Sequence, residues 1–158
     1  MITETAEPAE GRAAWMAVLA QAAPEALAAH LAPCLDLLGG RPKVRWLRRP
    51  EIGAVMVRGR AGGTGAPFNL GEMTVTRASL SLPDGTVGHA WVPGRSAEHA
   101  ENAALVDALM QGATSAPVVA EKILRPLEEA ARTARTTRGQ KAAATKVDFF
   151  TMVRGENA

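Results

Sequence analysis

The spacing of hydrophobic positions predicts two helices near the start of the chain. Trp15 and Leu19 are four residues apart within the alanine-rich stretch 12–22, so they share one face of a helix. Pro24 suits the first turn of a second helix, whose apolar stripe consists of leucines three or four residues apart (Leu27, Leu31, Leu35 and Leu38). We expect Pro33 to kink or interrupt this second helix, and the Gly-Gly pair after the stripe to end it.

In the middle of the chain, short apolar segments separated by turn sequences replace the helical period. Large apolar residues are concentrated in four segments: 43–47, 51–60, 72–82 and 86–92. Pro50 separates the first two, and the Pro-Asp-Gly sequence between the last two is typical of a β-hairpin. Because tight loops join these segments, we expect an antiparallel sheet of about four strands.

The third of these segments, 72–82, does not keep one alternation. Its apolar residues occupy odd positions at Met73 and Val75 but even positions from Ala78 onward. This change indicates either a bulge or a strand that is covered on both faces.

The helical period returns after the sheet. Ser96 can cap a third helix that continues through residue 111, Pro117 opens another helical stretch, and Pro126 divides it. The order of elements predicts an α+β fold in which N-terminal and C-terminal helices flank the sheet. We expect a flexible tail over 1–11 and a single domain over 12–158, with a C-terminal helical extension that docks on a partner.

The composition narrows the function classes. A length of 158 residues with 47% hydrophobic residues is enough to bury a core, and the single Cys34 excludes an internal disulfide and a thiolate metal cluster. The net charge of +2 is too small to require an anionic partner. Glutamates precede Arg12, the reverse of a signal peptide, and no apolar run approaches the roughly 20 residues of a membrane span. These features favour a cytoplasmic protein.

The glycine-rich stretch RGRAGGTGAPFNLGE, from Arg58 to Glu72, is the first candidate site. It lacks the Gly-Lys-Ser/Thr order of a Walker loop, and the strand-like sequence after it does not fit a dinucleotide fingerprint. A hairpin explains it better: if 51–60 and 70–80 pair across a loop at 61–69, Arg58 lies opposite Glu72. Contact with a partner or with a phosphorylated ligand remains possible for six residues of the stretch (Arg58, Arg60, Gly62, Gly63, Thr64 and Gly65).

The titratable residues do not predict catalysis. The spacing of His30, His89 and His99 matches no metal-binding motif. His99 with Glu98 and Asp107 could form an acid–base group, but a solvated helix face explains them more simply. Cys34 lies between two leucines and is expected in the core.

Two features near the C-terminus suggest contacts with other molecules. Five cationic residues and no acidic one lie between Arg132 and Lys146, a pattern typical of a solvated helix face and less often of a nucleic-acid site. The following VDFFTMV segment is too apolar for a free tail, so it packs on this domain or on another subunit. Its candidate docking residues are Val147, Phe149, Phe150, Met152 and Val153.

Four stretches together resemble the PhnG family, the G subunit of the bacterial carbon–phosphorus lyase core complex. They are WMAVLA, AGGTGAPFNLGEMTVTRASLSLPDGTVGHAWVPGR, HAENAALVDALMQ and KVDFFTMVRGENA. The likeness extends from about Arg12 to the C-terminus, and the four stretches occur in the order found in the family.

The resemblance implies a required but non-catalytic subunit. In such complexes the G, H and I subunits, helped by the L protein, transfer the ribose 5-triphosphate of ATP to a phosphonate such as methylphosphonate and release adenine. The J subunit then breaks the carbon–phosphorus bond, and nucleosidase chemistry is associated with the I subunit. The implied partners are therefore the H, I and J subunits and the L protein, with no nucleic acid and no membrane. ATP is a substrate of the complex, and no cofactor is expected on this chain.

Two other functions stay open on the residues alone. The main alternative is a free-standing module that binds a nucleotide or another phosphorylated ligand through the glycine-rich loop. A nucleic-acid-binding protein is the third possibility, against which the weak charge excess and the low aromatic content of 4% both count.

Overall fold

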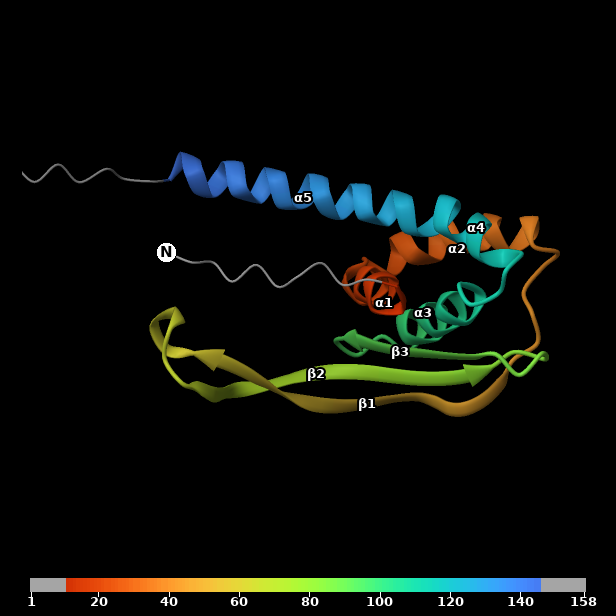
Figure 1. The fold of residues 1–158 in the computed structure, drawn as a ribbon, viewed down its shortest axis with the longest axis horizontal. Helices are drawn as coiled ribbons and strands as arrows, with labels where there is room; N and C mark the ends of the chain where they lie inside the picture. The colour runs from red at the N-terminus through yellow and green to blue at the C-terminus, as the bar shows by residue number, and fades with distance from the viewer. Residues whose placement is uncertain (1–10, 146–158) are drawn as a thin grey trace, which may run out of the picture.

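The computed structural model describes residues 11–145, which form an antiparallel sheet with helices packed on one of its faces (Figure 1). The sheet has three strands in the order β1-β2-β3, with β2 in the centre. They are β1 (Arg45–Arg60), β2 (Pro67–Ser81) and β3 (Val87–Pro93). The α+β class and the antiparallel pairing predicted from the sequence are confirmed.

The sheet has three strands rather than about four because the segments 43–47 and 51–60 belong to one strand. Pro50 does not end β1; instead, the register against β2 shifts between Arg48 and Glu51. Such irregularities absorb residues that cannot join the regular ladder, and a proline is one of them. In the central strand, Val75 and Thr76 are consecutive and both buried, so β2 is covered on both faces at that point.

The helices follow the predicted order along the chain. They are α1 (Arg12–Gln21), α2 (Pro24–Leu37), α3 (Ala97–Leu109), α4 (Ser115–Val119), a π-helical turn (Ala120–Leu124) and α5 (Arg125–Ala144). The side chain of Ser96 accepts a hydrogen bond from the backbone N–H of His99, as expected of the N-cap of α3. Of the two effects expected of Pro33, a kink or an interruption, the interruption does not occur: α2 continues past it, and Pro33 is on the exposed side of the helix.

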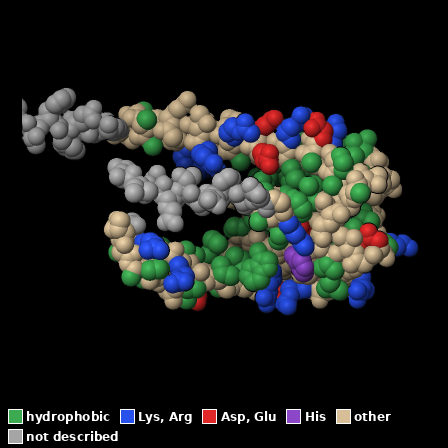
Figure 2. All heavy atoms as spheres, in the orientation of Figure 1, with side chains coloured by type: hydrophobic (Ala, Val, Ile, Leu, Met, Phe, Trp, Pro, Cys, Tyr) green, Lys and Arg blue, Asp and Glu red, His purple; other side chains and the backbone are tan. Residues whose placement is uncertain are grey.

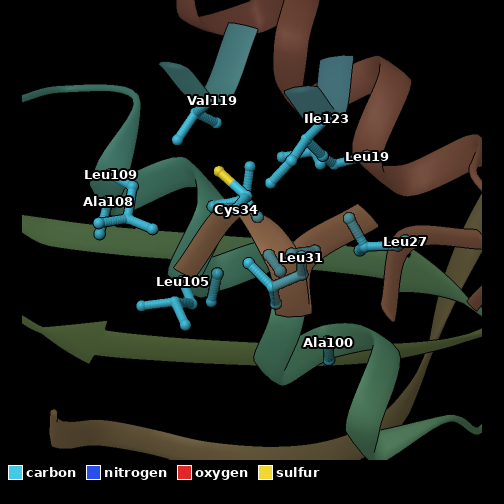
Figure 3. Close-up of a cluster of buried hydrophobic side chains, with 14 of the residues drawn as sticks. Leu19, Leu27, Leu31, Cys34, Ala100, Leu105, Ala108, Leu109, Val119 and Ile123 are labelled. Carbon is cyan, nitrogen blue, oxygen red and sulfur yellow. The ribbon is translucent and has the colours of Figure 1, made fainter. Parts of the chain in front are cut away.

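The core lies between the helices and the near face of the sheet (Figure 3). Cys34 and leucines of α2 meet α3 and the π-helical turn there, around Leu105 and Ile123. The helix α3 approaches β3 so closely that a Cβ atom on Gly88 would lie 2.0 Å from the carbonyl oxygen of Ala104. A glycine is therefore required at this position of the sheet.

Two elements extend beyond the core. Past the pair formed by Val75 and Pro93, β1 and β2 continue as a two-stranded hairpin, which we call the arm (residues 54–60 and 67–74 with the loop 61–66). The helix α5 extends past the other helices on the same side of the molecule as the arm (Figure 1). Among residues 11–145, no helix has both the length and the apolar character needed to cross a membrane.

Candidate functional site

The glycine-rich loop lies at the tip of the arm. A single 3₁₀ turn, Ala61–Gly63, follows β1, and Gly62 has a φ of 60°, a left-handed conformation that glycine adopts easily. The backbone N–H of Gly65 donates to the carbonyl oxygen of Ala61 at 3.0 Å, and a Cβ atom on Gly65 would lie only 2.7 Å from that oxygen. At least two of the glycines are thus explained by the turn itself, and the hairpin interpretation is confirmed.

The register of this hairpin differs from the expected one. Arg58 lies opposite Asn69, and Glu72 lies opposite Met56, so the predicted charge pair between Arg58 and Glu72 is wrong. The first reason is that β2 begins earlier than expected, which reduces the loop to 61–66. The second is a register shift next to Arg58, where β2 contains one more residue than β1.

The cationic groups of the loop are exposed. The guanidinium group of Arg60 donates to the carbonyl oxygen of Gly65 at 3.3 Å, which holds this side chain across the mouth of the turn. Arg58, Gly62 and Thr64, which are close to Arg60 in sequence, are also exposed. This arrangement offers two positive charges at the end of a hairpin, and contact with a phosphorylated ligand remains a prediction for these residues together with Gly63.

The arm carries large hydrophobic side chains that the domain itself does not bury. The exposed fractions are 51% for Met56, 44% for Phe68, 66% for Leu70 and 42% for Met73, and that of Ile52 at the base of the arm is 53%. Figure 2 shows hydrophobic side chains at the surface of this hairpin, beside Lys or Arg side chains. Two-stranded hairpins are only marginally stable in water, and contiguous exposed apolar surface marks interaction sites. The arm is therefore the part of the described chain best suited to dock on another molecule.

Asp107 is the most strongly engaged polar group of the described chain, although the sequence did not single it out as a structural residue. Its carboxylate is fully buried on α3 and accepts hydrogen bonds from Nε and Nη2 of Arg12 at 3.0 and 2.6 Å. Nε1 of Trp15 and the backbone N–H of His89 donate to it at 2.9 and 2.8 Å. The hydrogen bonds that Arg12 donates to Asp107 raise the pKa of Arg12, outweighing the effect of burial. These contacts join α1, α3 and β3, so Asp107 has a structural role.

The acid–base group considered from the sequence is not assembled. His99 is buried, and its Nε2 lies 2.9 Å from the carbonyl oxygen of Leu19. Glu98 is exposed, whereas the carboxylate of Asp107 is occupied by Arg12 and Trp15. His99 and Asp107 are eight residues apart on α3, which places them roughly 12 Å apart along the helix axis.

The exposed face of the sheet carries a second polar cluster that the sequence did not reveal. Glu51 on β1 pairs with Arg48 and with Arg77 of β2, and the guanidinium of Arg77 lies 5.3 Å from the ring centroid of Trp91 on β3. Partial burial raises the pKa of Glu51, but hydrogen bonds from Arg77 and Arg48 outweigh it, so the pKa is below the ordinary value of 4.5. The cluster connects all three strands. Strand register brings its members together, which no local sequence pattern indicates.

Ser79 and His89 also meet on this face, with Ser79 Oγ 2.8 Å from His89 Nδ1. Both belong to paired positions of β2 and β3, and the His89 side chain is exposed. A nucleophile–base pair also needs a third group that orients the base. The hydrogen bonds of the described residues supply none to the His89 ring, so this pair is a cross-strand contact.

Other candidate chemistry is limited in the described part of the chain. Within residues 11–145 no three His, Cys, Asp or Glu side chains are grouped as metal ligands. Burial raises the pKa of the Cys34 thiol, although the charge of Lys122 acts in the opposite direction. The predicted docking residues Val147, Phe149, Phe150, Met152 and Val153 lie outside the described residues, so their role stays a prediction.

Comparison with known proteins identifies the family of this chain. Residues 10–155 match the family described as "Phosphonate metabolism protein PhnG". A relative from Rhizobium meliloti (strain 1021), named "Alpha-D-ribose 1-methylphosphonate 5-triphosphate synthase subunit PhnG", is 45% identical over 125 residues, which cover 77% of this chain and 78% of that protein. A match over nearly the whole chain includes the arm, the loop and the residues around Asp107, so the chain belongs to the PhnG family of phosphonate metabolism proteins.

Proposed function

We propose that this chain is a required, non-catalytic subunit of a ribose 1-methylphosphonate 5-triphosphate synthase complex. The complex transfers the ribose 5-triphosphate of ATP to a phosphonate such as methylphosphonate and releases adenine. The name of the Rhizobium meliloti relative supports the reaction and the status of a subunit. The partners we propose are the H, I and J subunits with the L protein, in the cytoplasm.

The observation that carries this proposal is the uncovered arm. Exposed fractions of 44% for Phe68 and 66% for Leu70, on a hairpin without a third strand, are costly for a protein that works alone. Covering such side chains with a partner removes apolar surface from water, which contributes about 1.5–3 kcal/mol for each fully buried large side chain before entropy losses. A subunit that docks through the arm accounts for its length and its composition.

The polar groups of the described chain support a non-catalytic role. Asp107, Glu51 and His99 all make internal contacts that hold elements together. Displacement of adenine requires groups that position a phosphonate, bind a triphosphate and stabilise positive charge on the ribose. Among the described residues, the loop at the tip of the arm offers two arginines for one of these tasks, and we propose that other subunits supply the remaining groups.

Co-expression tests this proposal directly. The chain is produced with a tag together with the H, I and J subunits from the same genome, and the complex is isolated through the tag. We expect stoichiometric copurification, and adenine release from ATP and methylphosphonate when the L protein is added. The isolated chain should release no adenine. Copurification of none of the subunits, or adenine release by the isolated chain, would show that the proposal is wrong.

A second candidate function rests on the exposed Arg58 and Arg60 at the tip of the arm. Together with the glycine amides of the loop, these side chains suit a triphosphate, so a free-standing module that binds a nucleotide remains the alternative. Calorimetric titration of the isolated chain with ATP separates the two functions. Binding that is lost in the Arg58→Ala/Arg60→Ala variant, in a chain that copurifies with no other subunit, would support the alternative.

A further inference from the structure

The helix α5 is uncovered over most of its length. Leu127 is its last buried residue, and every residue from 128 to 145 is exposed. At about 1.5 Å per residue, this exposed part is roughly 27 Å long. Helices in water are stabilised mainly by packing of one face, and no residue of this segment is buried within the described chain. Its length therefore indicates that another element covers it.

A groove lies where α5 leaves the body. Its volume is about 830 Å³, and it runs between α5 on one side and α1 with the start of α2 on the other. Its walls are mostly small and apolar, with Val18 and Leu127 as the largest aliphatic residues among many alanines (Ala14, Ala17, Ala22, Ala23, Ala26, Ala130, Ala131 and Ala134). Small side chains on two flanking helices let the backbone of a third helix approach closely.

The groove has a cationic border on the side of α5. Arg132 and Arg135 line it. Arg138 and Lys141 follow on the exposed part of α5, beyond the residues that line the groove. No acidic residue occurs between 130 and 145, so the only carboxylate that α5 contributes to the groove is Glu128 at its inner end. Beyond Glu128 and Glu129, every charged side chain of α5 is cationic. A partner complementary to this border carries negative charge opposite Arg132 and Arg135.

We propose that this groove binds an amphipathic helix of another subunit, with an apolar ridge on the alanine floor and Asp or Glu side chains against Arg132 and Arg135. This inference rests on the proposed function, because it takes the partner from the same complex. The groove would then be a second docking surface of the chain, separate from the arm. The apolar floor favours a protein over a nucleic acid, and none of the described residues that line the groove is an aromatic residue that could stack on a base.

Two matched variants test the proposal within the co-expressed complex. Ala130→Glu/Ala134→Glu places two carboxylates on the floor of the groove. Thr136→Glu/Gln140→Glu adds the same charge at the same spacing on the opposite face of α5. All four positions are exposed, so both variants should fold as well as the wild type. We expect the groove variant to weaken assembly by about tenfold or more and the control to assemble normally.

The outcomes separate this inference from the proposed function. If the wild-type chain captures no other subunit, the proposed function fails. If the wild type and the groove variant assemble equally well, or if groove variant and control lose assembly equally, the groove is not the docking site and the inference is overturned. The thermal unfolding of each free variant is followed by circular dichroism. A cooperative transition like that of the wild type shows that the variant is folded.

Hydrogen exchange tests whether α5 is covered in the complex. In the wild-type complex we expect the backbone amides of residues 130–141 to exchange about tenfold or more slowly than in the free chain. The inference is overturned if these amides are equally fast in both, or if they are already slow in the free chain. In the second case, deletion of residues 1–10 and the mass of the free chain in solution show whether its own N-terminus or a second copy fills the groove. Protection by an RNA 20-mer at physiological salt, without protection in the complex, would also overturn it.

Discussion

Asp107 joins three elements through one side chain. Its carboxylate has no exposed surface, while the paired Arg12 side chain is 40% exposed. A buried charge that loses its partners costs more than the pair contributes, because its desolvation is no longer compensated. Removal of the carboxylate is also destabilising, because the N–H groups of Trp15 and His89 lose their hydrogen-bond acceptor.

We expect Asp107→Ala to lower the free energy of unfolding by about 3 kcal/mol. Urea unfolding followed by tryptophan fluorescence measures this difference. Glu98→Ala, on the exposed side of the same helix, serves as the control and should change stability by less than about 0.5 kcal/mol. Equal effects of the two substitutions would mean that the hydrogen bonds of Asp107 contribute nothing to stability.

Gly88 provides a second test at the scale of a residue. A Cβ atom at this position would overlap the carbonyl oxygen of Ala104, whereas a Cβ atom on Gly53 of β1 would meet no atom within 4 Å. Gly88→Ala should therefore destabilise the chain by about 1–3 kcal/mol or more through displacement of α3 from the sheet. Gly53→Ala should have little effect in the same denaturation experiment. A neutral Gly88→Ala substitution would show that α3 can shift freely.

At the scale of the element, substitutions in the arm should affect assembly without affecting the stability of the free chain. Its side chains are exposed in the free chain, so their removal costs little there, but they become costly to lose once a partner covers them. The distinction can be measured because the chain offers an exposed leucine elsewhere. Leu70 on the arm and Leu37 at the end of α2 are both 66% exposed.

We expect Leu70→Ser to weaken assembly with the other subunits by about tenfold, a loss of about 1.4 kcal/mol, without lowering the urea midpoint of the free chain. Leu37→Ser should leave both properties unchanged. Affinity is measured by titrating the labelled variant against the remaining subunits. If the two serine variants bind equally well, the arm does not dock through Leu70.

The pairing of β1 with β2 should depend on pH through Glu51. Its pKa is lowered in the folded chain, so the stability that it contributes is present above its ordinary value of 4.5 and is lost as the pH falls through the lowered folded value. Acidification from about pH 6 to about pH 3 should therefore reduce the urea midpoint of the wild type more than that of Glu51→Gln. Identical losses would mean that the pairs of Glu51 with Arg48 and Arg77 do not stabilise the sheet.

At the scale of the whole molecule, the sequence predicts what depends on local spacing. The helices α1, α2 and α3, the cap at Ser96 and the hairpin of β2 with β3 all follow from patterns within a few residues. The sequence did not predict that β1 continues past Pro50 or that the arm register shifts next to Arg58, because pairing energies summed over a whole strand decide such features.

The site was less predictable than the fold. Arg12 and Asp107 are 95 positions apart, and Glu51 reaches Arg77 only through strand register. Contacts between residues so far apart in sequence leave no local pattern from which they could be predicted. The apolar segment Glu-Met-Thr-Val-Thr predicted a strand correctly, yet nothing local indicates that Met73 faces solvent while Val75 is buried. That difference depends on where β3 ends, since Pro93 lies opposite Val75.

The contacts around Asp107 also determine how the sheet can grow. The backbone N–H of His89 and the carbonyl oxygen of Val87 belong to the edge strand β3, and Asp107, Arg12 and Gln111 use them. An incoming strand from another chain finds these two groups already occupied, which disfavours backbone pairing along the first part of this edge. The protein can thus expose an apolar hairpin for assembly while the first part of this edge of the same sheet is protected against fibril-like polymerisation.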